Sequence, residues 1–110
     1  MSDDLHDWTT GTPRVLVSTC ESCGHRWYLR RDRCPRCTGP FRTAASGGRG
    51  TVVATTRSDA GGIALVDLAE GVRVLGRCDP ALQPGAAALL TFRAGPGDPV
   101  AVPYFEAESP

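Results

Sequence analysis

The stretch CESCGHRWYLRRDRCPRC, residues 20–37, decides how this chain folds. It contains two Cys-x2-Cys pairs, and ten residues separate the second cysteine from the third. Two tight turns of this kind bring four thiolates within reach of one ion. Zinc binds such ligands at the corners of a tetrahedron, with Zn–S bonds of about 2.3 Å. We therefore predict a zinc site whose ligands are Cys20, Cys23, Cys34 and Cys37. Because four thiolates leave no open coordination position, this zinc is expected to be structural and not catalytic.

Other uses of the same cysteines remain open at this stage. Iron in a rubredoxin-like site would take the same four ligands. Two disulfides would suit a secreted chain, but a cytoplasmic chain rarely forms them. His25 follows the first pair and is interpreted as a strand or surface residue, since the tetrahedron is already filled. Cys78 is far from both pairs and is expected to be a small buried apolar residue.

Composition and charge place the chain among small globular proteins. It has 110 residues, 41% of them hydrophobic, and a formal net charge of zero with a pI near 6.7. The charge is uneven: residues 14–49 carry eight arginines against two acids, whereas residues 50–110 carry four arginines against seven acids. The N-terminus lacks the pattern of a secretory signal, and no apolar run is long enough to span a membrane. We expect a soluble, cytoplasmic protein.

The sequence divides into three parts. Residues 1–13 form an N-terminal arm, in which Leu5 and Trp8 are spaced like one amphipathic helical turn. Residues 14–46 form the zinc ribbon, with short strands expected in RVLVST and WYL. Residues 47–110 form a mostly β domain with five predicted strands: Gly50–Arg57, Gly62–Glu70, Val72–Cys78, Ala86–Arg93 and Pro99–Phe105. Five short strands with a longer link after the third are typical of a small OB-fold barrel.

The arginines suggest two kinds of partner. Nucleic acid is one, since zinc ribbons and OB-folds both bind it, but the neutral chain and the scarcity of aromatic residues on the predicted strands disfavour it. An anionic cofactor or an acidic protein surface is the other. On the third predicted strand, Arg73, Leu75 and Arg77 share one face, and Val72 and Val74 lie on the other.

Catalysis by the isolated chain is disfavoured. The sequence shows no Ser-His-Asp set, no P-loop, no paired catalytic carboxylates in one motif and no open metal site. Asp67 and Glu70 lie on one predicted strand and are interpreted as surface residues. We predict no catalytic residues and leave the cofactor-binding residues, other than those for the metal, unassigned.

The ordered motifs resemble the DUF35 family, which pairs a rubredoxin-like zinc ribbon with an OB-fold. The matching pieces are CESCG, CPRC, GRGTV, ALVDLAEG, VRVLGRC, LQPG and VPYFE, which together span roughly residues 14–106. The cysteine pairs alone are not specific to this family, whereas their ordered combination with the strand motifs is considerably more so. The sequence departs from the family pattern in two places. Many members carry a longer N-terminal helix than the arm seen here, and many carry a proline-rich step before the second cysteine pair, where this chain has WYLRRDR.

The resemblance implies a function that composition does not. Family members are typically accessory subunits of thiolase-fold enzymes, of aldolases of steroid side-chain breakdown, or of enoyl-CoA hydratases. The resemblance thus implies a non-catalytic scaffold in a hetero-oligomer, which binds a partner enzyme and helps to present its acyl-CoA substrate. The alternative is a nucleic-acid-binding ribbon and OB-fold module.

Overall fold

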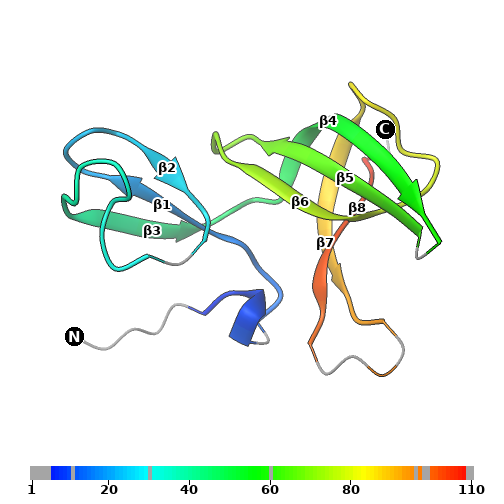
Figure 1. The fold of residues 1–110 in the computed structure, drawn as a ribbon, viewed down its shortest axis with the longest axis horizontal. Coiled ribbons are helices and arrows are strands. Elements are labelled where there is room, and N and C mark those ends of the chain that lie inside the picture. Colours follow the sequence, from blue (N-terminus) through cyan, green and yellow to red (C-terminus); the bar gives the residue numbers. More distant parts are fainter. Residues whose placement is uncertain are drawn as a thin grey trace.

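Two β-sheets and one short 3-10 turn make up the structure (Figure 1), a computed structural model that describes residues 6–10, 12–29, 31–59, 61–95, 97 and 100–108. The elements in chain order are η1 (Trp8–Thr10), β1 (Leu16–Cys20), β2 (Arg26–Trp27), β3 (Phe41–Ala45), β4 (Arg49–Ser58), β5 (Gly61–Leu68), β6 (Arg73–Cys78), β7 (Ala87–Arg93) and β8 (Val102–Ala107). The predicted mostly β class is confirmed. No helix among the described residues has the length and apolarity needed to cross a bilayer.

The first sheet carries the cysteines. Its strand order is β2-β1-β3, and both pairings are antiparallel. The strands predicted in RVLVST and WYL correspond to β1 and β2, although β2 is only two residues long. β3 was not predicted, because FRTAA lacks the β-branched run of a typical strand and its pairing partner, β1, lies more than twenty residues earlier.

The second sheet closes into the predicted five-stranded barrel, with the order β4-β5-β6-β8-β7 and with β7 pairing back to β4. Only the β6–β8 pairing is parallel. The five predicted strands correspond to β4 to β8. The last of them begins later than expected, at Val102, and its Pro103 pairs with Phe92 of β7 just before the pairing of β8 with β6 begins at Tyr104.

Side chains alternate across the barrel wall as a half-buried strand requires. Along β6, Val74 and Cys78 are buried, whereas Arg73, Leu75 and Arg77 are exposed, which confirms the predicted faces of this strand. The core contains Phe105 and a set of small apolar residues that includes Val52, Ala64, Val66, Val74 and Ala88.

Gly76 marks the closest approach of two barrel strands. A Cβ atom at this position would lie 2.8 Å from the ring of Phe105 and 2.9 Å from the carbonyl oxygen of Pro103. Both neighbours belong to the fully packed interior or its backbone, so they cannot yield. The glycine in the motif VRVLGRC is therefore required by the closure of β6 against β8.

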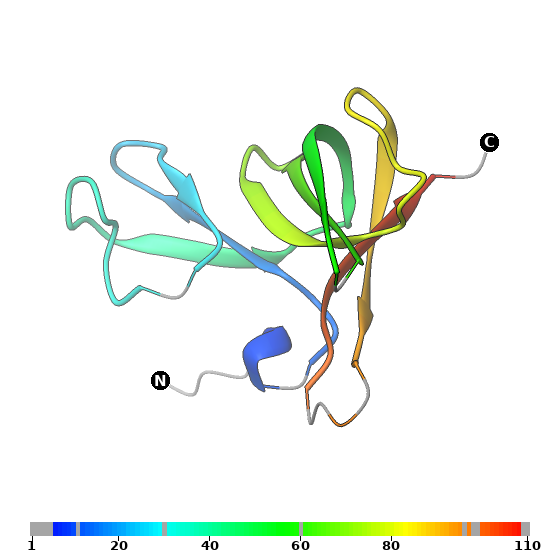
Figure 2. The ribbon, with the colours of Figure 1, turned by 45° about the vertical axis from the view of Figure 1, so that its right-hand side comes forward.

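The ribbon sheet lies beside the barrel (Figure 2). Val15, just before β1, and Val17, within it, belong to the same buried cluster as the barrel residues. Trp8 of the arm stacks on Tyr28 of the ribbon at 6.1 Å between ring centroids and contacts Phe92 of β7 at 6.5 Å. The arm therefore joins the two sheets. Leu5, the other residue of the predicted amphipathic turn, lies outside the described residues.

Glu70 fixes the segment between the two sheets. It lies in the turn after β5, where its carboxylate accepts hydrogen bonds from the Ser46 hydroxyl at 2.8 Å and the Gly47 backbone N–H at 2.9 Å. Its backbone carbonyl accepts a bond from the Arg26 guanidinium of β2. The expectation that Glu70 is simply a surface residue on a strand is therefore wrong, whereas Asp67 is exposed as predicted. Partial burial would raise the pKa of Glu70, but the Gly47 and Ser46 donors hold it below its ordinary value of 4.5.

We predict that Glu70→Ala destabilises the chain by about 1–2 kcal/mol, because two hydrogen bonds to a partly exposed carboxylate are lost. Since the pKa of Glu70 is lowered by folding, this contribution is present above pH 4.5 and is lost as the pH falls through the folded-state pKa. Urea unfolding of both proteins at pH 7 and pH 3.5 measures it. Asp67→Ala, which removes an exposed pair with Arg73, is the matched control and should change stability little. Equal losses in the two variants would contradict the role of Glu70.

Candidate metal centre

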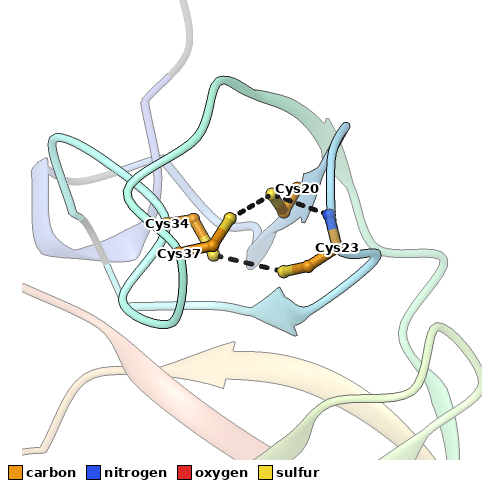
Figure 3. A group of neighbouring side chains, drawn as sticks. All are labelled: Cys20, Cys23, Cys34 and Cys37. Atoms are coloured by element: carbon orange, nitrogen blue, oxygen red, sulfur yellow. Dashed lines mark hydrogen bonds between the residues drawn. The ribbon is translucent and has the colours of Figure 1, made fainter.

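The four predicted cysteine ligands come together at one end of the ribbon (Figure 3). Cys20 ends β1, Cys23 lies in the following turn, and Cys34 and Cys37 lie in the turn before β3. Their sulfur atoms all lie within 4.8 Å of one another, with 3.4 Å between Cys20 and Cys37 and 3.7 Å between Cys23 and Cys34. Such a cluster could hold a metal ion. None of the five cysteines is in a disulfide.

The spacing of the sulfur atoms fits a tetrahedral metal ion, such as zinc or iron. Four ligands placed about 2.3 Å from a central ion at the corners of a tetrahedron lie about 3.8 Å apart. The two separations given above, 3.4 and 3.7 Å, lie close to this value, whereas a disulfide would require about 2.05 Å.

Backbone amides point at the first sulfur of each pair. The N–H groups of Ser22 and Cys23 donate to Cys20 Sγ at 3.3 and 3.4 Å, and the N–H of Arg36 donates to Cys34 Sγ at 3.4 Å. Hydrogen bonds of this kind favour the thiolate and orient it for a metal ion. The two turns therefore have matching architectures, as the repeated Cys-x2-Cys spacing predicts.

Each turn closes in the left-handed region of backbone space. Gly24 has φ of 77°, and its N–H bonds the carbonyl of Cys20 at 3.1 Å. Thr38 occupies the corresponding place in the second turn, with φ of 60° and a bond of 3.0 Å to the carbonyl of Cys34. Gly39, the next residue, is needed for space, since a Cβ there would lie 3.0 Å from Ser22 Oγ and 3.2 Å from Cys37 Sγ.

The sulfur atoms have unequal affinity for protons. The N–H of Cys23, aided by that of Ser22, lowers the pKa of the Cys20 thiol to about 6. The N–H of Gly39 favours the Cys37 thiolate, but the sulfur atoms of Cys20 and Cys23 outweigh it and raise the pKa of Cys37 to about 12. Without a metal ion, four crowded sulfur atoms cannot all be thiolates, and a cation at their centre removes this conflict.

The ribbon has a very small core of its own. Among the ribbon residues that the structure describes, its buried cluster consists of Cys20, Trp27 and Cys34. Phe41 packs against it edge-to-face, with 5.1 Å between the ring centroids of Phe41 and Trp27. Two of these three residues belong to the cysteine cluster. The stability of this end of the ribbon therefore depends on the sulfur atoms more than on apolar burial.

The other residues considered from the sequence lie elsewhere. His25 stacks on Trp27 at 5.7 Å and is not part of the cysteine cluster, as expected. Cys78 is buried in the barrel core, where burial and then the nearby Asp79 raise the pKa of its thiol. A thiol with a raised pKa is a poor nucleophile. His6 is exposed in the arm.

The same architecture is found in a solved structure. The structure named Ltp2-ChsH2(DUF35) aldolase contains a chain that aligns with a TM-score of 0.64 and 22% sequence identity, over 86% of this chain and 84% of that one. The chain has the fold of a DUF35 protein. The predicted resemblance to DUF35 therefore extends from the motifs to the three-dimensional structure. Comparison with protein-family models finds no match, and comparison with curated proteins finds no significant one.

We predict that Cys34→Ser in this DUF35-like ribbon lowers metal content well below one ion per chain. The melting temperature should fall by about 8 °C or more, which corresponds to roughly 1–2 kcal/mol in a domain of this size. Elemental analysis and thermal melting measure the two effects. Cys78→Ser is the control, since Cys78 lies outside the cluster and its substitution should leave metal content unchanged. Full occupancy in the Cys34 variant would refute the ligand assignment.

We also predict that Thr38→Gly stabilises the folded chain by about 0.5–1 kcal/mol. A β-branched residue at φ of 60° is strained, and the gain from relieving that strain exceeds the entropy that glycine adds to the unfolded chain. The mirror substitution, Gly24→Ala, should destabilise the metal-loaded chain by a similar amount. Denaturant unfolding of the three proteins checks this. A loss of stability in Thr38→Gly would mean that its hydroxyl, bonded to the carbonyl of Cys37, matters more than the strain.

Proposed function

We propose that this chain is a non-catalytic accessory subunit that binds an acyl-CoA-processing enzyme. The observation that carries the proposal is the shared fold with a DUF35 chain in a structure named as an aldolase. The fold extends over 86% of the chain and includes both the ribbon and the barrel. An enzyme of the aldolase, thiolase-fold or enoyl-CoA hydratase type is the partner that the DUF35 resemblance implies.

Zinc is the metal we propose for the ribbon, with Cys20, Cys23, Cys34 and Cys37 as its ligands. Four thiolates around one zinc ion leave a net charge of about −2, and this is partly balanced by arginines in the same loop, such as Arg33 and Arg36. With all four positions filled by protein, the metal supplies folding free energy and no reactive water.

The polar groups of the barrel support a non-catalytic role. Asp67 is paired with Arg73 at 2.6 Å, Glu106 with Arg93 at 2.9 Å, and Glu70 holds the segment between the sheets. Each of these carboxylates therefore has a structural partner. Cys78 is buried, and the four cluster thiolates would all be bound to the proposed zinc, so neither kind of thiol is free for nucleophilic attack.

The outer face of the barrel supports a protein partner over nucleic acid. In OB-folds the second and third strands commonly form the binding face, and single-stranded nucleic acid stacks there on aromatic side chains. Here these strands are β5 and β6, whose outward residues are Ile63, Leu65, Asp67, Arg73, Leu75 and Arg77. The face offers aliphatic and charged groups but no aromatic platform.

Capture from the native host tests the proposal. The tagged chain should co-purify in a fixed ratio with an aldolase, thiolase-fold or hydratase-type enzyme, identified by mass spectrometry. With that enzyme at 100 times its Kd, the apparent stability of the chain should rise by about 2.7 kcal/mol. The isolated chain should show no acyl-CoA turnover. Turnover by the pure chain, or salt-sensitive binding of single-stranded DNA or RNA without any enzyme partner, would contradict the proposal.

A further inference from the structure

A groove of about 350 Å³ lies between the ribbon and the barrel. The ribbon contributes His25 to Leu29 and Arg31 to its wall, and the barrel contributes the turn before β6 together with Arg73. Each sheet thus supplies one wall, and neither sheet alone could form the groove.

The two walls are held in place independently of any ligand. Arg26 of the ribbon wall donates to the backbone carbonyl of Glu70, on the barrel side. Tyr28 of the ribbon wall stacks on Trp8, which also contacts Phe92 of β7. The groove is therefore preformed, which lowers the entropy cost of binding.

The charge in the groove is one-sided. Arg26, Arg31 and Arg73 line it, and no Asp or Glu is among the described lining residues. Arg73 is paired with Asp67, which lies outside the groove, and Arg26 uses one N–H for the Glu70 carbonyl. Arg31 is exposed and has no hydrogen-bond or ion-pair partner among the described residues. Its guanidinium is available for a carboxylate of a binding partner.

One exposed leucine lines the groove, and a second lies two residues along β6 from its wall. Leu29 lies in the ribbon wall and is 50% exposed. Leu75 is 60% exposed and lies on the same outward face of β6 as Arg73, two residues away. Large apolar side chains at this exposure, close to arginines, are typical of a protein interface, with an apolar centre and a polar rim.

We propose that this groove binds an acidic, leucine-rich or otherwise apolar segment of a protein partner. Carboxylates of that segment pair with Arg31 and Arg26, and its apolar side chains cover Leu29 and Leu75. A small free anion would satisfy the arginines but leave both leucines in water, so charge and apolar surface together favour a polypeptide. The inference deepens the proposed function, since it rests on the chain being a subunit and names the surface that it uses.

The test is an NMR titration of the ¹⁵N-labelled, metal-loaded full chain. The probe is an acetylated twelve-residue peptide of alternating glutamate and leucine. It should shift the amide signals of the groove walls, with Leu29, Arg31 and Leu75 among the most affected, and bind with a Kd of about 1 mM or tighter. A peptide with lysine in place of glutamate, and inorganic pyrophosphate, are the two comparison ligands.

Substitutions make the test specific. Arg31→Glu should weaken peptide binding about tenfold, the usual effect of losing a charge-assisted hydrogen bond. Arg42→Glu is its matched control, because Arg42 is exposed on β3, at the opposite edge of the ribbon sheet from β2. Leu75→Ser should also weaken binding, whereas Val53→Ser, at an exposed site on β4, should not. Amide spectra of each variant show directly whether it is folded.

The outcomes separate the groove from the proposed function. Absence of shifts from the acidic peptide, equal binding of the lysine peptide, or shifts caused only by pyrophosphate would each overturn the docking groove. If the peptide binds as expected but no enzyme co-purifies with the chain, the proposed function fails and the groove stands. If an enzyme co-purifies equally with wild type, Arg31→Glu and Leu75→Ser, the groove fails and the proposed function stands.

Discussion

The mutual approach of four cysteine sulfur atoms is the constraint on which the ribbon depends. In the described part of the ribbon, Trp27 is the one buried member of this cluster besides Cys20 and Cys34, so apolar burial contributes little to holding this end of the sheet. β2 is two residues long and would not persist alone. The turns are built to present sulfur, with amide groups directed at Cys20 and Cys34 and left-handed residues after Cys23 and Cys37. A bound cation converts the repulsion among these sulfur atoms into the attraction that closes the ribbon.

The ribbon in turn depends on the barrel for its orientation. The apolar start of β1 packs into the barrel cluster through Val15 and Val17. Trp8 joins the two sheets on one side, and Glu70 holds the connecting segment through Ser46 and Gly47. The aromatic contacts are apolar and the Glu70 contacts are polar, so heat and acid should affect them differently. Because both sets act together, the ribbon and the barrel present a single continuous surface.

The local patterns were sufficient to predict the cysteine cluster, the five barrel strands and the faces of β6. Each of these follows from spacing within a few residues: Cys-x2-Cys for the turns, and alternation of Val with Arg for the strand. The features that were missed all depend on contacts between distant residues. β3 forms because it pairs with β1. Glu70 bonds Ser46, which lies more than twenty residues earlier. Trp8 packs on Tyr28 of the ribbon and Phe92 of the barrel. Thr38 was missed for another reason, since a β-branched residue gives no signal for the left-handed conformation that it adopts.

The arrangement of the two sheets explains which kind of partner the arginines suit. A neutral chain argues against a nucleic-acid binder, yet its arginines are concentrated in the ribbon, and the fold places Arg26 and Arg31 in one groove with Arg73 of the barrel. Aliphatic side chains are exposed where an OB-fold that binds single strands would display aromatic rings. A surface that combines arginines with exposed leucines suits a protein segment. Burial of apolar side chains supplies most of the affinity, and the charges fix how the segment is aligned on the surface. The cysteine cluster therefore matters through position: by closing the ribbon, it holds Leu29 and Arg31 opposite Arg73 in the groove.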